Sequence, residues 1–68
     1  MNEIIFMVEE APEGRYLARM VGQSIMTEGV SLAALHTNVR DAVRCHFDDS
    51  QAPQVVRLHV VREEVIVV

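Results

Sequence analysis

One segment of the chain, residues 31–47, has the pattern of an amphipathic α-helix, and no second segment resembles it. Apolar side chains recur there at steps of three and four residues, which places them on one stripe of a helix. They are Leu32, Leu35, Val39, Ala42, Val43 and Phe47. Ser31 suits the N-cap position, because its hydroxyl can accept a hydrogen bond from a free amide of the first turn. This single stripe therefore has to cover most of whatever sheet the rest of the chain forms.

Four further segments have strand character: residues 4–8, 16–21, 24–27 and 55–61, of which the third has the least regular pattern. Pro12 and Gly14 indicate a turn, so the first two strands are predicted to form a β-hairpin. The predicted fold is one α+β domain over residues 1–68. Its sheet is expected to be antiparallel, in the order β-β-β-α-β, with the helix on one face.

The first strand is apolar on both of its alternating sides: Ile4, Phe6 and Val8 on one, Ile5 and Met7 on the other. A strand covered on one face only normally alternates with polar residues. Either this strand lies mid-sheet with both faces covered, or a second subunit buries its other face.

The segment Val65 to Val68 is also apolar, at an end of the sequence where exposure is expected. A domain of this size is marginally stable by itself. We therefore expect a homodimer or tetramer, with the tail folding back on its own sheet as the alternative. The expected interface comprises Ile5, Met7, Val65, Ile66 and Val67.

The net charge of −4 comes from ten acidic and six basic residues, and all six basic residues are arginine. An acidic chain repels phosphate backbones, so direct binding of nucleic acid is not expected. The charge favours encounter with a basic partner instead. No apolar run approaches the ~20 residues of a membrane span, and the first residues lack the pattern of a signal peptide. We expect a cytoplasmic protein that does not bind membranes.

No group of residues predicts catalysis, a metal site or a cofactor. Cys45 and His46 are adjacent on the predicted helix, so their side chains diverge by about 100° and cannot easily chelate one ion. Cys45 as a nucleophile would need a nearby base that the sequence does not identify. Glycine-rich phosphate loops are absent. The prediction is a protein that is not an enzyme.

Five basic or titratable side chains are candidates for binding a partner. His36, Arg40 and Arg44 are four residues apart and share one helix face, which could contact an acidic surface or an RNA phosphate. Arg57 and His59 share the outward side of the last strand. The alternative for both groups is an ordinary solvated surface.

Several short motifs resemble the HicB-like antitoxin family. Residues 13–16, Glu-Gly-Arg-Tyr, match its first turn, and Gly22 matches the glycine after its second strand. Residues 27–32, Thr-Glu-Gly-Val-Ser-Leu, match the segment that leads into its helix, and Ala42 matches a small residue within that helix. The resemblance is to a short stand-alone member consisting of the N-terminal partner-binding domain.

This resemblance implies a fold like that of a double-stranded-RNA-binding domain and a role as an antitoxin. Such a module sequesters a small basic RNA-cleaving toxin, and charge complementarity with an acidic domain would suit that role. The main alternative is a stand-alone homo-oligomeric regulatory or interaction protein. An RNA-binding module using His36, Arg40 and Arg44, and a small enzyme using Cys45, are the other hypotheses.

Overall fold

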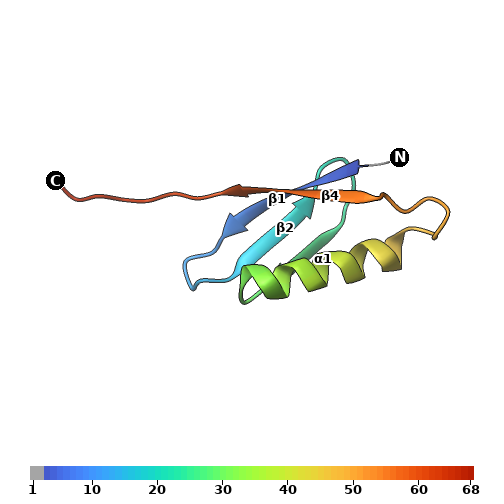
Figure 1. The fold of residues 1–68 in the computed structure, drawn as a ribbon. Coiled ribbons are helices and arrows are strands. Elements are labelled where there is room, and N and C mark those ends of the chain that lie inside the picture. The colour runs from blue at the N-terminus through green and yellow to red at the C-terminus, as the bar shows by residue number, and fades with distance from the viewer. Residues whose placement is uncertain (1–2) are drawn as a thin grey trace.

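The computed structural model describes residues 3–68 and has the α+β class predicted from the sequence. The chain forms β1 (Glu3–Glu10), β2 (Tyr16–Met20), β3 (Met26–Gly29), α1 (Leu32–His46) and β4 (Val55–Val61). The four strands make one sheet in the order β3-β2-β1-β4 (Figure 1). The third strand thus begins two residues later than expected.

The prediction of a fully antiparallel sheet is wrong for β4. The pairs β1–β2 and β2–β3 are antiparallel, but β4 runs parallel to β1. Two successive hairpins make β3 parallel to β1, and α1 then carries the chain back to the end of the sheet where β3 began. β4 therefore starts in the direction of β3, and it joins the free side of β1 in the parallel sense.

The core lies between one face of the sheet and α1. Phe6 and Val8 of β1 and Leu35 of α1 are completely buried. The remaining buried apolar side chains are Ile4, Ala18, Met20, Ile25, Val39 and Val43. Burying an aliphatic or aromatic side chain of this size contributes about 1.5 to 3 kcal/mol, so these few residues supply most of the driving force for folding.

The helical stripe is confirmed at its centre and is looser at its ends. Leu35, Val39 and Val43 are buried, whereas Leu32 is 41% exposed. The Ser31 hydroxyl accepts a 3.1 Å hydrogen bond from the amide of Ala34, as its N-cap position predicted. The helix therefore begins where the sequence indicated.

α1 lies over β3 and β2 and not centrally over the sheet (Figure 1). The close approach depends on Gly29, because a Cβ there would lie 2.6 Å from the amide nitrogen of Leu35. The inner side of β4 is consequently poorly covered. Val56 and Leu58 are half-buried, and Val60, which shares their side of the strand, is 45% exposed.

The tail after β4 does not join the sheet of its own chain. Residues 62–68 form no strand, and they run away from the domain in line with β4 (Figure 1). The expected alternative, a tail folded back on its own sheet, is therefore wrong. The second face of β1 is also uncovered, since Ile5 and Met7 are 39% and 38% exposed.

Candidate protein-binding surfaces

The outer face of the sheet, opposite α1, carries a row of side chains that crosses all four strands. Met7 of β1 pairs with Arg19 of β2 and His59 of β4, and Arg19 pairs with Met26 of β3. Met26 is 61% exposed. Since residues in register share a face of a sheet, apolar and basic groups alternate along this row. It is a mixed surface that no element of residues 3–68 covers.

Arg57 lies on the same outer face, beside Ile5 in the register of β1 and β4. Its guanidinium donates a hydrogen bond to the carboxylate of Glu3, and this bond and the charge of Glu3 raise the pKa of Arg57 above its ordinary value. Both side chains are substantially exposed to solvent. Arg57 is therefore already paired with an acid of its own sheet.

The opposite side of the molecule has a groove between α1 and β4. A cavity of about 160 Å³ is lined by His36 and Arg40 of α1 and by Val56 and Leu58 of β4, together with Val39. A second hollow of about 480 Å³ continues along it, lined by Arg40, Arg44 and residues of the loop that precedes β4. We call these two hollows together the helix–strand groove.

The structure thus separates the five predicted partner-binding residues into two groups. His36, Arg40 and Arg44 line the helix–strand groove, whereas Arg57 and His59 lie on the outer face. The separation follows from β4, whose successive side chains point to opposite faces of the sheet. One partner surface cannot contact all five unless it wraps around β4.

An acidic hollow of about 430 Å³ lies where β1 ends and β4 leaves the sheet. Its lining includes Glu9, Glu10 and Glu63, with Arg62 as the only basic side chain. After Glu10 the chain turns away from the sheet, and Gly14 in this turn adopts a left-handed φ of 91°. β4 continues past the end of β1, which leaves the hollow between them. These acids were not predicted to be binding residues, although acidic pairs at the ends of two strands were visible in the sequence.

The predicted oligomer-interface residues also fall on two separate surfaces. Ile5 and Met7 are on the outer face of the sheet. Val65, Ile66 and Val67 are between 81% and 94% exposed along the tail. In the tail, Arg62 and Glu64 form an exposed ion pair with 3.4 Å between their charged atoms. Residues two apart can pair in this way on one side of an extended segment.

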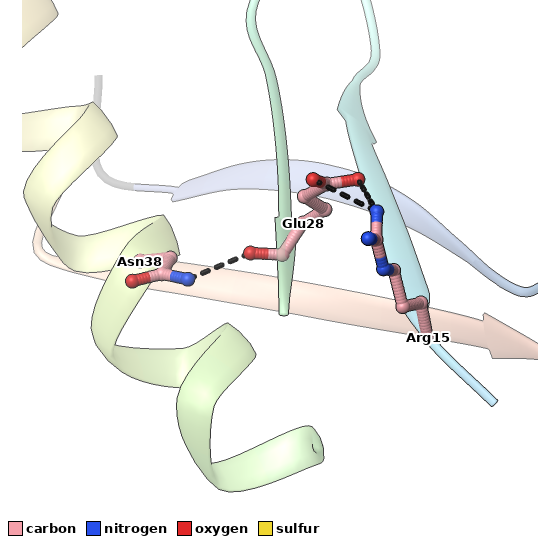
Figure 2. Close-up of polar contacts among 3 residues, drawn as sticks. All are labelled: Arg15, Glu28 and Asn38. Atoms are coloured by element: carbon pink, nitrogen blue, oxygen red, sulfur yellow. Dashed lines mark hydrogen bonds and ion pairs between the residues drawn. The ribbon is translucent and has the colours of Figure 1, made fainter. Parts of the chain in front are cut away.

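The outer edge of β3 is closed by α1. The side-chain amide of Asn38 donates a 2.6 Å hydrogen bond to the carbonyl of Glu28, which points away from β2 toward the helix (Figure 2). Arg15 holds the Glu28 carboxylate from the other side, at 3.3 and 3.4 Å (Figure 2). Sequence reasoning missed Asn38, whose polar side chain does not differ in pattern from its neighbours on the exposed helix face.

Residues 3–68 contain no group of three His, Cys, Asp or Glu side chains placed to hold a metal ion. Cys45 is exposed, and the ring of its neighbour His46 lies 2.7 Å from the amide oxygen of Gln23. Across the same residues, no helix has the length and apolar character required to cross a membrane.

Comparison with known proteins gives two clear relatives. A UPF0150 protein of Archaeoglobus fulgidus is 46% identical over 55 residues, which is 81% of this chain and 82% of that protein. The chain belongs to the UPF0150 family. A UPF0150 protein of Thermotoga maritima is 36% identical over 67 residues, 98% of this chain and 94% of its own. No protein-family model matches the chain. No solved structure matches it.

Proposed function

We propose that this UPF0150 protein is a binding module of the antitoxin type, which sequesters a small basic RNA-cleaving protein and has no enzymatic activity of its own. The observation that carries the proposal is the acidic hollow formed by Glu9, Glu10 and Glu63 on a chain of net charge −4. Arginine and lysine side chains of a basic partner would find complementary charge there, which speeds encounter and fixes register.

The resemblance of residues 13–16 and 27–32 to the HicB-like antitoxins supports the same role. These residues have structural duties in the fold, since Gly29 permits the close approach of α1 and Ser31 caps that helix. The motif therefore specifies the scaffold. The acidic side chains around the hollow are what this scaffold would present to a basic protein.

The test is affinity purification of the tagged protein from its own cells at low salt, followed by mass spectrometry. The expected result is a small, strongly basic protein that is released when the salt concentration rises, because salt screens exposed charge pairs. The released protein should cleave RNA, and adding the purified UPF0150 protein back should suppress that cleavage. Recovery of no basic protein contradicts the antitoxin role.

Two charge-matched variants locate the contact. Glu9→Gln with Glu10→Gln and Glu63→Gln removes three negative charges from the hollow. Asp41→Asn with Asp48→Asn and Asp49→Asn removes three on the helix and the loop after it. The first variant should lose the basic partner and the second should retain it. Equal loss in both would mean that overall charge, and not the hollow, attracts the partner.

A second candidate is a stand-alone homo-oligomeric interaction protein, which the apolar exposure of the tail and of Ile5 and Met7 favours. Purification would then recover the protein alone, as a defined oligomer by light scattering. This outcome separates the two candidates, since the antitoxin role requires a second, basic component.

A further inference from the structure

We propose that the tail of each chain, Val65 to Val68, adds to the free edge of β4 in a second copy of the same chain, so that two copies exchange tails in one continuous sheet. This inference does not depend on the antitoxin role, because it concerns only contacts between two copies. It gives one explanation for both the free edge of β4 and the exposed apolar tail.

The two edges of the sheet differ in their capacity to accept a strand. β3 is the short edge, and Asn38 of α1 occupies its Glu28 carbonyl. β4 has seven residues, Val55–Val61, and the edge that faces away from β1 has no neighbouring strand. A long edge strand left bare is a template for pairing with another chain. β4 is the edge available for strand addition.

The tail cannot reach that edge within its own chain. Reversal between Val61 and Val65 would need a tight turn, and the three residues between them, Arg62, Glu63 and Glu64, include none of the glycine or asparagine that such turns prefer. The chain instead continues straight on from β4 (Figure 1). A second copy can supply the edge that its own chain cannot.

In the register that we propose, the two tails run antiparallel, and Glu63 lies on the two-fold axis between the copies. Arg62 of each copy then faces Glu64 of the other copy, so the dimer has two favourable charge pairs between its chains. The only like-charge contact is that of Glu63 with its own equivalent. The remaining pairs set apolar tail against β4: Leu58 with Val68, Val60 with Ile66, Val61 with Val65, and His59 with Val67.

This register also covers surface that α1 leaves bare. Val60 is 45% exposed and Leu58 half-buried on the inner side of β4. Ile66 and Val68 of the second copy have the same parity along the strand, so they lie on that same side, next to Val60 and Leu58. Exchange therefore removes apolar surface from water on both the tail and β4.

The first test is the molar mass of the full chain by size-exclusion chromatography with light scattering. The native protein should be a dimer at micromolar concentration. Ile66→Asp should raise the dissociation constant of the dimer by more than about tenfold, since it places an unpaired charge against Val60. Val30→Asp is the matched control: Val30 is 77% exposed before α1, and this variant should remain a dimer. A monomeric native chain, or an Ile66→Asp variant whose dimer dissociation constant is unchanged, overturns the proposal.

A second pair of tests checks the register. In a Cys45→Ser background, Glu63→Cys should form an intermolecular disulfide rapidly, because residue 63 faces its own equivalent across the axis. Val55→Cys, far from the axis, should not. Arg62→Glu and Glu64→Arg should each weaken the dimer, and the double variant should restore it. Crosslinking at Val55→Cys but not at Glu63→Cys overturns this register.

Discussion

The side-chain amide of Asn38 on α1 donates a 2.6 Å hydrogen bond to the main-chain carbonyl of Glu28 on β3. A helix side chain thus takes the place that a further strand would occupy at this edge. The bond joins the only helix of residues 3–68 to the strand that precedes it. β4, at the other end of the sheet, is the open edge.

Asn38→Ala should lower the free energy of unfolding by about 0.5 to 1.5 kcal/mol, the usual contribution of one hydrogen bond. Urea titration followed by circular dichroism measures the change, at one fixed protein concentration because any association shifts apparent stability. Asp41→Ala is the control on the same helix, since Asp41 is exposed. If both variants behave alike, the Asn38 bond contributes nothing to stability.

Gly29→Ala should destabilise the fold by about 1 to 3 kcal/mol, because the new Cβ would lie 2.6 Å from the amide nitrogen and 2.9 Å from the Cα of Leu35. Only backbone movement can relieve that overlap, so α1 must shift away from β3. Gly14→Asn is the comparison: the space around Gly14 is open and asparagine tolerates its left-handed φ of 91°. A neutral Gly29→Ala variant would contradict the close helix–strand approach.

Leu35→Ala and Leu32→Ala make the same chemical change on one helix at different depths. Leu35 is completely buried and Leu32 is 41% exposed. Leu35→Ala should cost about 2 to 5 kcal/mol of unfolding free energy, and Leu32→Ala about 1 kcal/mol or less. The midpoint of urea denaturation reports both. Equal losses would mean that Leu32 is buried in solution, for example by a second copy.

Arg57→Gln should change stability little, because its ion pair with Glu3 is exposed on both sides. The bond raises the pKa of Arg57, so any stabilisation is present below the range in which a guanidinium titrates and is lost only above it. The difference between the native protein and the variant should therefore be constant from about pH 6 to about pH 9. A difference that varies across this range would require another titrating group to interact with Arg57.

Much of the local structure could be predicted from spacing alone. The steps of three and four residues in 31–47 identified α1 and its buried centre at Leu35 and Val39. Alternation in residues 4–8 placed Ile4 and Ile5 on opposite sides of the strand, and the structure shows that Ile4 is the buried one. Both patterns are local, because the repeat of the element itself decides which side chains share a face.

The binding surfaces could be predicted only in part. The sequence grouped His36, Arg40 and Arg44 on one face, and the structure places all three along the helix–strand groove. The acidic hollow was not foreseen, because Glu10 and Glu63 are far apart in the chain and meet only when β4 passes the end of β1.

The sequence by itself determined which elements form and which residues share a side of each one. Only the tertiary structure decided the direction of β4 and the half of the sheet that α1 covers. Those features depend on which edge of the sheet is free to take β4. Asn38 and α1 close the side of β3, both sides of β2 are taken, and the remaining place beside β1 admits a strand only in the direction that the helix leaves it.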